Sequence, residues 1–426
     1  MSKVTPLLLC EGVLVFSLAC GSTPKTTCGT TLKNTDANAS IVYAQPGQTV
    51  KEAVDSLPQD GGTVCLGIGK WASGYNSTFI SKQHVTIQGS GMPGYNPNFT
   101  AMSGGTIVQG QLSASSGADY LTVQDLGVDA GSSYINSENG GVATNAFAIF
   151  NNGEVVGAPP VESPRVENVS CLGYSPTAQA HCMLIENVNQ AYIHNVVAVM
   201  NLHGLVLKGT NSVVDGVVSR GHSITSVIVK SDNYAPASQD NLSNITIEPL
   251  IYPGDTRGVS VIGVDAPISG INISNVQIHS PLGWGIHVQG ASPTTPASDI
   301  SFSAISIDYQ GRSPTSDYCV QLVEYVSDVN IDNLDCSNMW AGIAPYLPAT
   351  GAFSDFKVTN SQFINVATNG VETYGLWNIS NSTFGSIDGN GIVADSGVTT
   401  VSGNIFTNIG GTDLYSAGGT FVVLMP

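Results

Sequence analysis

One short phrase recurs along most of this chain: an alternating strand, a polar turn residue that is often asparagine, and a second strand. Examples are VENVSCLG (166–173), IHNVVAVM (193–200), INISNVQIH (271–279) and WNISNSTF (377–384). Equivalent turn positions are occupied by Asn168, Asn195, Asn275, Asn333, Asn360, Asn381 and Asn404. Apolar side chains that alternate with a period of two identify strands rather than helices. A repeat of roughly 22 residues is typical of a solenoid.

The alternation also predicts which side chains face the interior. In HGLVLKG (203–209), Leu205 and Leu207 are expected to point inward, and Val206 and Lys208 outward. Coils of this length, closed by tight turns, form a right-handed parallel β-helix in which neighbouring coils lie about 4.8 Å apart. Repeated asparagines can hydrogen-bond to one another along such a stack. We therefore expect an all-β chain, with one solenoid domain of about 10–12 coils over residues 41–426.

The N-terminal part of this domain, about 41–90, has a different pattern. The stretch TVKEAVDSL (49–57) predicts a short amphipathic helix with Thr49 as its N-cap. Such a helix would cover the open end of the solenoid, which otherwise exposes apolar interior and an unpaired strand edge. At the opposite end, FVVLMP (421–426) is interpreted either as a last strand or as an apolar patch covered by a partner.

The first 20 residues predict an export signal. Lys3 precedes the apolar run PLLLCEGVLVFSLAC, and GSTPKTT follows it. The pattern resembles that of a bacterial lipoprotein signal with Cys20 as the lipidated residue, and residues 21–40 have the composition of a flexible linker. We therefore expect an exported protein, extracellular or an outer-membrane or periplasmic lipoprotein, that contacts a membrane only through a lipid anchor.

Six cysteines remain after the signal, which suits an oxidising compartment. Proximity in the sequence pairs Cys171 with Cys182 and Cys319 with Cys336, and leaves Cys28 for Cys65. Six cysteines allow many other connectivities, so the pairing is a prediction. A zinc site is the alternative, but the chain has no CxxC pair to supply the usual ligand spacing.

The charge balance narrows the range of partners. The net charge is −18, and only 10% of the residues are charged. Nucleic-acid binding requires a basic stripe, which this balance argues against. It also argues against electrostatic docking on an anionic membrane. We expect a monomer without a cofactor, and leave calcium as an option.

The chain resembles the pectate-lyase-like β-helix superfamily over residues 41–426. The resemblance rests on PGQTVKEAVDSLPQDGGTVCLGIGKW (46–71) and on HVTIQGSG (84–91). It implies the parallel β-helix fold, but it is weak for activity, because relatives include lyases, hydrolases, epimerases, phage tailspikes and non-catalytic surface proteins. The paired aspartates of polygalacturonase-type hydrolases are missing here.

One further stretch, VIVKSDN (227–233), resembles the KSxN segment of the alginate-lyase and chondroitinase-B family. The resemblance implies that Lys230 acts as a base, with Ser231 and Asn233 at the other matching positions.

Residues Glu186, Lys208 and Lys230 are spaced by one coil (208 − 186 = 22; 230 − 208 = 22), so they are expected to stack on the outer face. Basic residues are scarce, with 13 Lys and Arg in all, and four of them fall within 208–257. An acidic protein with one local basic cleft suits an acidic, uronate-containing polysaccharide.

We therefore predict a lyase that cleaves this polymer by β-elimination. The reaction needs neutralisation of the uronate carboxylate, a base and an acid, and a lysine whose pKa is lowered by a neighbouring lysine is a candidate base. The predicted catalytic residues are Lys208, Lys230, His203 and Asp232. The predicted substrate-binding residues are Glu186, Arg220, His222, Tyr234 and Arg257.

Three alternatives stay open. The lysines can instead belong to ordinary ion pairs between coils, which contribute about 0–1 kcal/mol each. The protein can be a glycoside hydrolase that uses two carboxylates, with Asp232 and Asp265 or Glu186 and Asp232 as pairs, whereas Glu372 and Asp395 are expected to be solvated. It can also be a non-catalytic glycan-binding or cell-envelope solenoid. Aromatic residues that could stack on sugars are Trp284, Trp340, Tyr346 and Tyr374.

Overall fold

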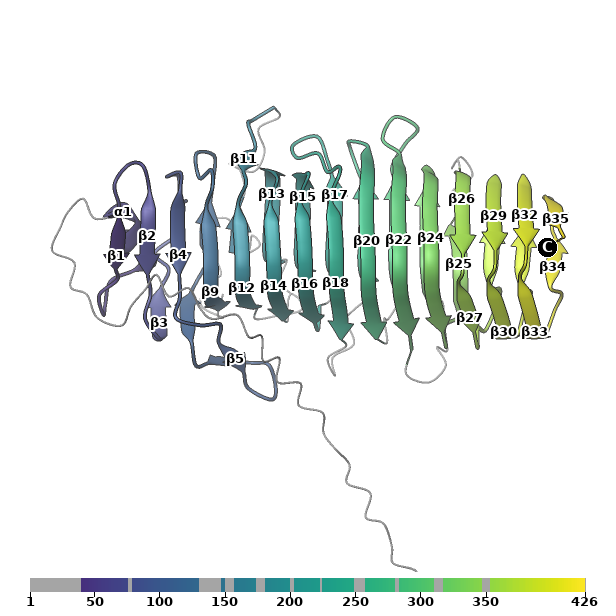
Figure 1. The fold of residues 1–426 in the computed structure, drawn as a ribbon, viewed down its shortest axis with the longest axis horizontal. Helices are drawn as coiled ribbons and strands as arrows, with labels where there is room; N and C mark the ends of the chain where they lie inside the picture. Colours follow the sequence, from purple (N-terminus) through teal and green to yellow (C-terminus); the bar gives the residue numbers. More distant parts are fainter. Residues whose placement is uncertain are drawn as a thin grey trace, which may run out of the picture.

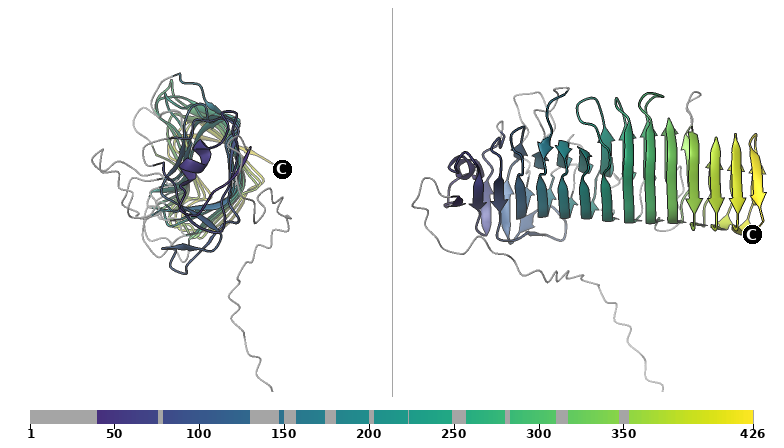
Figure 2. Two further views of the ribbon diagram at one scale, coloured as in Figure 1. Left: turned by 90° about the vertical axis from the view of Figure 1, so that its left-hand side faces the viewer. Right: turned by 45° about the horizontal axis from the view of Figure 1, so that its top comes forward.

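The structure is an elongated stack of parallel coils (Figure 1). It is a computed structural model that describes residues 40–75, 79–129, 147–149, 157–173, 181–199, 203–222, 224–248, 257–279, 283–309, 317–346 and 353–425. The signal, the linker, Cys20 and Cys28 lie outside these ranges. One end-on view shows the coils superimposed around a common interior (Figure 2). The prediction of a right-handed parallel β-helix is confirmed.

One long side of the solenoid is a 13-stranded sheet whose neighbouring strands are parallel. Its strands are β8 (Leu112–Ala114), β10 (Phe147–Ile149), β11 (Val161–Glu162), β13 (His181–Asn189), β15 (His203–Thr210), β17 (Thr225–Ser231), β19 (Arg257–Gly263), β21 (Trp284–Gly290), β23 (Tyr318–Glu324), β25 (Ala341–Tyr346), β28 (Val371–Thr373), β31 (Ile392–Ala394) and β34 (Leu414–Ser416). Apart from β11, which pairs beside β13, each coil contributes one strand to this sheet.

The rest of the wall is a 20-stranded parallel sheet. It contains β1 (Ile41–Tyr43), β2 (Gly62–Cys65), β3 (Gly69–Ala72), β4 (Val85–Gln88), β7 (Thr106–Gln109), β9 (Thr122–Asp129), β12 (Arg165–Leu172), β14 (Tyr192–Val199), β16 (Val213–Arg220), β18 (Asn241–Glu248), β20 (Ile268–His279), β22 (Ala297–Asp308), β24 (Val326–Ser337), β26 (Phe353–Thr359), β27 (Gln362–Ile364), β29 (Leu376–Ser380), β30 (Thr383–Ile387), β32 (Val398–Ser402), β33 (Ile405–Ile409) and β35 (Thr420–Leu424). A separate antiparallel pair joins β5 (Gly94–Tyr95) to β6 (Met102–Ser103).

The apolar core runs along the whole axis between these sheets. Leu205 and Leu207 are fully buried in it, as the alternation predicts. Toward the C-terminal end, aromatic rings continue the stack. Phe384 lies between Phe363 and Phe406, with ring centroids 5.1 Å and 4.9 Å away. Identical positions on successive coils therefore pack on one another, which is how a short repeat builds a continuous core.

The repeated asparagines occupy left-handed turns. Six of the seven predicted positions have a positive φ, between 51° and 57°, a conformation that asparagine tolerates better than most residues. Their amides also link coils, as where Asn195 Nδ2 donates to Asn168 Oδ1 at 2.8 Å. Asn404 differs, because it has no positive φ and its Oδ1 accepts the Ser382 N–H at 2.9 Å.

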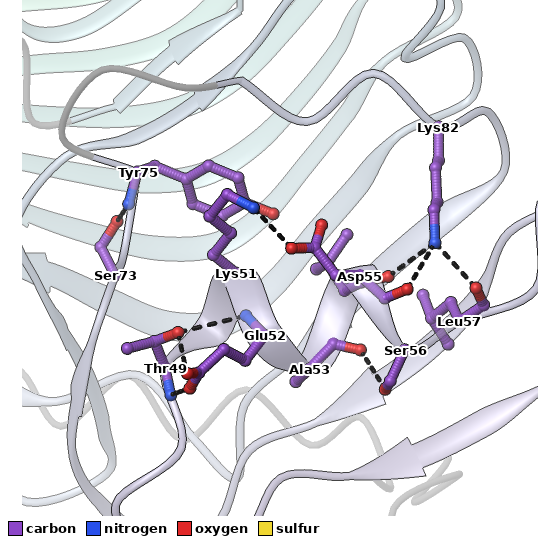
Figure 3. A network of polar contacts seen from close by, with 11 residues as sticks. Thr49, Lys51, Glu52, Ala53, Asp55, Ser56, Leu57, Ser73, Tyr75 and Lys82 are labelled. Atoms are coloured by element: carbon purple, nitrogen blue, oxygen red, sulfur yellow. Dashed lines mark hydrogen bonds and ion pairs between the residues drawn. The ribbon is translucent and has the colours of Figure 1, made fainter. Parts of the chain in front are cut away.

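The single described helix, α1 (Val50–Asp55), covers the N-terminal end of the stack (Figures 1 and 3). Its N-terminus has the capping box that Thr49 predicts: the Glu52 N–H donates to Thr49 Oγ1 at 3.1 Å and the Thr49 N–H to Glu52 Oε2 at 2.8 Å. At the other end, Lys82 Nζ donates to the carbonyl oxygens of Val54, Asp55 and Leu57 at 2.7–3.1 Å. Both helix ends are thereby satisfied, and the predicted cap is confirmed.

Two of the predicted disulfides are present. Cys171 is bonded to Cys182, and Cys319 to Cys336, each tying a strand of one sheet to the other. Cys65 at the end of β2 is also disulfide-bonded, while its predicted partner Cys28 lies outside the described residues. Among the described helices, none is long and apolar enough to cross a membrane.

The C-terminal segment forms a last strand, β35, which pairs with β32. This outcome agrees with the first of the two interpretations of FVVLMP. The last coil still exposes apolar side chains, since Ile405, Val423 and Leu424 are each more than half exposed. The described structure thus has a covered N-terminal end and an open C-terminal one.

Candidate functional site

The outer face of the 13-stranded sheet carries the side chains of interest in columns, because the strands are parallel and in register. One column at the strand starts contains His181, His203, Thr225, Arg257, Trp284 and Tyr318. A central column contains Leu184, Val206, Ile228, Ser260, His287, Gln321 and Ala344, and the pairing of Ile343 with Val371 makes Glu372 the next residue in line. Along each strand, the residues before and after a central-column residue point into the core, as Ile286 and Val288 do around His287.

The predicted ladder is present as a charged cluster of Glu186, Lys208, Lys230 and Asp232. The register places Glu186 of β13 beside Lys208 of β15. Lys208 Nζ lies 2.6 Å from Glu186 Oε1 and 2.9 Å from Asp232 Oδ2. Lys230 Nζ lies 3.7 Å from the same Asp232 oxygen. Each lysine therefore has a carboxylate partner.

The charges of this cluster stabilise one another. Burial disfavours the charged form of Lys208, but attraction and hydrogen bonds from Glu186 and Asp232 outweigh burial and raise the Lys208 pKa. Burial likewise works against ionised Asp232, yet the hydrogen bond from Lys208 and those from the N–H groups of Tyr234 and Ala235 lower its pKa. The expectation that Lys208 has a lowered pKa is therefore wrong, because the nearby carboxylates outweigh the second lysine.

Two of the other predicted site residues lie along the strand-start column of the same face. The His203 ring stacks on His181 with centroids 5.0 Å apart, and burial lowers the pKa of His203 to about 4. The Arg257 guanidinium lies over the Trp284 ring, 4.4 Å from its centroid. Neither residue has a direct contact with the charged cluster among those the structure describes.

The remaining predicted residues are more distant from it. Arg220 ends β16 of the other sheet, and its Nε lies 2.6 Å from Glu248 Oε2. His222 is fully buried, with Nε2 3.2 Å from the Ala198 carbonyl oxygen. Tyr234 lies beside the cluster and is 41% exposed. The expected single cleft around Arg220 and His222 is therefore absent from the described part of the chain, because neither side chain is on the 13-stranded sheet.

The structure instead shows a cavity of about 240 Å³ farther along the same face. We call it the aromatic cavity. Its lining includes Tyr318, Gln321, Trp340, Tyr346, Asn369 and Glu372. These residues come from β23, from β25 and the residue before it, and from β28 and the turn before it. Three successive coils thus build it.

Gln321 at the base of the aromatic cavity has an unusual environment. It is only 4% exposed, and its Oε1 has no hydrogen-bond partner within the described ranges. Its column neighbours Ser260 and His287 are also buried, and Ser260 Oγ and His287 Nδ1 likewise have no hydrogen-bond partner among the described residues. Buried polar atoms normally find partners, and each unmet one costs about 1–3 kcal/mol. A row of them on an outer face is an observation that a bound ligand would explain.

One carboxylate, Glu372, is in the lining of the cavity, and Asp395 is near it. Glu372 Oε1 accepts a 2.8 Å hydrogen bond from Asn369 Nδ2. Burial raises the pKa of Glu372 despite this bond, and the neighbouring Asp395 raises it further. Burial also raises the pKa of Asp395, which a hydrogen bond from Tyr374 opposes. The expectation that Glu372 is an ordinary solvated residue is wrong, because the aromatic wall and the turn before β28 enclose it.

The sequence shows Trp340 and Tyr346 as separate aromatic residues and Glu372 and Asp395 as carboxylates of later coils. In the register Glu372 pairs with Val393, and Asp395 lies two residues farther along the same coil. No group of three or more His, Cys, Asp or Glu side chains in the described ranges is arranged to hold a metal ion. The expectation of no cofactor stays a prediction.

Comparison with known proteins adds evidence on the fold. No known family model and no curated protein matches the chain. Among solved structures, the chain is similar to the catalytic domain of a GH87 alpha-1,3-glucanase in complex with nigerose, at 12% identity and a TM-score of 0.56, over 93% of this chain and 69% of that one.

Two further solved structures are similar. PfbA, a surface adhesin of Streptococcus pneumoniae, has 13% identity and a TM-score of 0.55, over 86% of this chain and 88% of that one. The mannuronan C-5 epimerase AlgE6 A-module of Azotobacter vinelandii has 15% identity and a TM-score of 0.50, over 88% and 94%. Identities this low establish the fold alone, and the chain is therefore a parallel β-helix protein.

Proposed function

We propose that this protein is exported, and that it binds and processes a polysaccharide on the outer face of the 13-stranded sheet, with the aromatic cavity as the centre of the site. The observation that carries the proposal is the buried, unpartnered Gln321 Oε1 at the base of a cavity with Tyr318, Trp340 and Tyr346 in its lining. Aromatic rings bind the apolar faces of sugars, and a buried amide fixes their hydroxyl groups. The two described disulfides support export.

The size of the cavity suits one sugar ring at a time. Its volume of about 240 Å³ is below that of pockets for drug-sized ligands, about 300–1,000 Å³. The register extends the site along the face, since Tyr318 pairs with Trp284, and Trp284 with Arg257. Neighbouring units of a chain would therefore meet the stacked Trp284 and His287 rings, whose centroids are 4.7 Å apart.

Two of the similar structures support the glycan class, since one is a glucanase in complex with nigerose and another a mannuronan epimerase, while the third is a surface adhesin. They therefore leave both catalysis and simple adhesion as models for a chain of this fold.

For processing, the carboxylates favour hydrolysis over β-elimination. Glycoside hydrolysis uses one carboxyl group that stays protonated as the acid and a second carboxylate. Burial raises the pKa values of Glu372 and of Asp395 on the next coil, so this pair would supply the two groups. Elimination by Lys208 is less favoured, because deprotonation of this lysine would leave the buried Glu186 without a cation and Asp232 with Lys230 alone.

The test is a screen of the purified protein against neutral and acidic polysaccharides. Binding is measured by calorimetry, hydrolysis by new reducing ends and elimination by ultraviolet absorbance of unsaturated products. Trp340→Ala and Tyr346→Ala are expected to weaken binding about tenfold or more. Tyr415→Ala is the matched control, because Tyr415 is an exposed aromatic of β34 on the same sheet. Equal effects of all three substitutions, or no bound glycan at all, would contradict the proposal.

A further inference from the structure

The aromatic cavity offers uncharged polar groups and one carboxylate, and no cation in its described lining. Gln321 Oε1 is a buried acceptor without a partner among the described residues, and Glu372 contributes a carboxylate. Asn369 cannot add a free amide oxygen, since its Oδ1 already accepts the Asn390 N–H at 2.8 Å and Asn390 Nδ2 at 3.2 Å. Acceptors are matched by a ligand that donates, as sugar hydroxyl groups do and a carboxylate cannot.

The described lining of the cavity contains one charged residue, Glu372, and no lysine, arginine or histidine. Asp395 follows the strand that pairs with β28. On this face Arg257 lies two coils from Tyr318 in the register, which is about 10 Å, and it is engaged with Trp284. A uronate placed in the cavity would therefore meet carboxylates and find no described counter-ion.

We infer that the aromatic cavity selects an uncharged glycosyl unit and excludes a uronate, which makes the substrate a neutral polysaccharide or a neutral stretch of a mixed one. The inference rests on the proposed function and narrows its substrate class. It departs from the acidic polymer that the Lys208 and Lys230 ladder suggested, because those two lysines neutralise carboxylates of their own protein.

The expected discrimination is about tenfold, the effect of one like-charge repulsion at roughly 6 Å in a partly solvated site. Calorimetry would compare oligosaccharides of galactose with those of galacturonate, and of glucose with those of glucuronate, matched in length and linkage. Neutral ligands are expected to bind at least tenfold more tightly. Added salt is expected to reduce the ratio, because it screens the repulsion.

Glu372→Gln is the decisive variant, because it removes the charge and keeps the shape and one amide oxygen. We expect the preference of this variant for neutral ligands over uronates to fall toward one, because the repulsion of the uronate carboxylate is removed. An unchanged melting temperature and circular dichroism spectrum would show that the variant is folded. Asp332→Asn, which removes a carboxylate from the other sheet, should leave the ratio unchanged.

The outcomes separate the two proposals. If no oligosaccharide of either class binds, the proposed function itself fails. If uronates bind as tightly as their neutral counterparts, the selection of uncharged sugars is overturned while polysaccharide binding stands. If wild-type protein prefers neutral ligands and Glu372→Gln keeps the full preference, the carboxylate is not its cause, and this inference is again overturned.

Discussion

Lys208 and Glu186 form an ion pair across neighbouring coils, with Nζ and Oε1 2.6 Å apart and side chains only 13% and 11% exposed. Asp232 shares the same ammonium group from the opposite side. Removal of one partner from a buried charged network leaves the others unpaired, which costs about 3–5 kcal/mol. The pair is therefore interpreted as part of the scaffold.

The first prediction separates the two lysines by stability. Lys208→Met should lower the free energy of unfolding by about 3 kcal/mol, because Glu186 stays buried without a cation and Asp232 keeps only Lys230, at 3.7 Å. Lys230→Met is the matched control and should cost less than about 0.5 kcal/mol, since its ammonium group lies 3.7 Å from Asp232 and its side chain is 33% exposed. Urea denaturation of both variants measures this, and equal losses would contradict the structural role.

A second prediction concerns the buried carboxyl group of Asp240. Its Oδ1 accepts the Ser212 N–H at 2.8 Å, and burial raises its pKa to about 7. Its ordinary pKa is lower, so the folded protein binds a proton between about pH 4 and pH 7 that the unfolded chain releases. The stability that this group contributes is fully present below pH 4 and is lost as the pH rises toward 7.

Asp240→Asn keeps the acceptor oxygen and removes the charge. We expect the variant to gain stability relative to the wild type at pH 8 and to match it near pH 4. Asp332→Asn should behave in the opposite sense, because hydrogen bonds from Thr359 and Asn360 lower the pKa of Asp332. The stability lost in Asp332→Asn should be present above the ordinary aspartate pKa, and it should fade as the pH falls. Thermal melts across this range would reveal either sign.

The third prediction addresses the aromatic stack of the core. Phe384→Ala should cost about 4 kcal/mol, since the fully buried ring contacts Phe363 on one side and Phe406 on the other. Phe406→Ala removes a ring of the same size from a partly exposed position on the last coil, so its cost should be about half as large. Denaturant midpoints at constant m-value give the stability loss of each variant. A larger loss for Phe406→Ala than for Phe384→Ala would contradict the prediction that interior rings contribute more than those of the last coil.

The fourth prediction tests the cap. Lys82→Met removes the donor to the carbonyl oxygens of Val54, Asp55 and Leu57, and should destabilise the N-terminal coils by about 1–2 kcal/mol. Lys70→Met replaces an exposed lysine of β3 and should have no measurable effect. Hydrogen exchange at α1 reports the loss locally, and unchanged protection there would argue against a capping role for Lys82.

The sequence predicts the fold well because a solenoid repeats local rules. Alternation alone places Leu205 inside and Lys208 outside, and a spacing of 22 residues places Glu186 beside Lys208. Neither the alternation nor the spacing predicts which of the two sheets a charged residue belongs to, because each coil contains strands of both sheets. Arg220 and His222 are near Lys208 in the chain, yet they belong to the other wall and to the interior.

The aromatic cavity was beyond prediction for a related reason. His287 pairs with Gln321 although 34 residues separate them (321 − 287 = 34), whereas Gln321 pairs with Ala344 after only 23 (344 − 321 = 23). Segments of unequal length between strands conceal the register there. Only the folded chain brings Gln321, Trp340 and Glu372 together.

The open C-terminal coil has a mechanical consequence. A coil is stabilised by its neighbours, and within the described residues the last coil contacts a neighbour on one side only, with Val423 and Leu424 exposed. Heating or an applied force should therefore unfold this end of the 13-stranded sheet first, beginning with β34 and then β31. The next strand in that order is β28, which carries Glu372. A ligand bound in the cavity would then stabilise β28, and the unfolding of coils would stop at this strand.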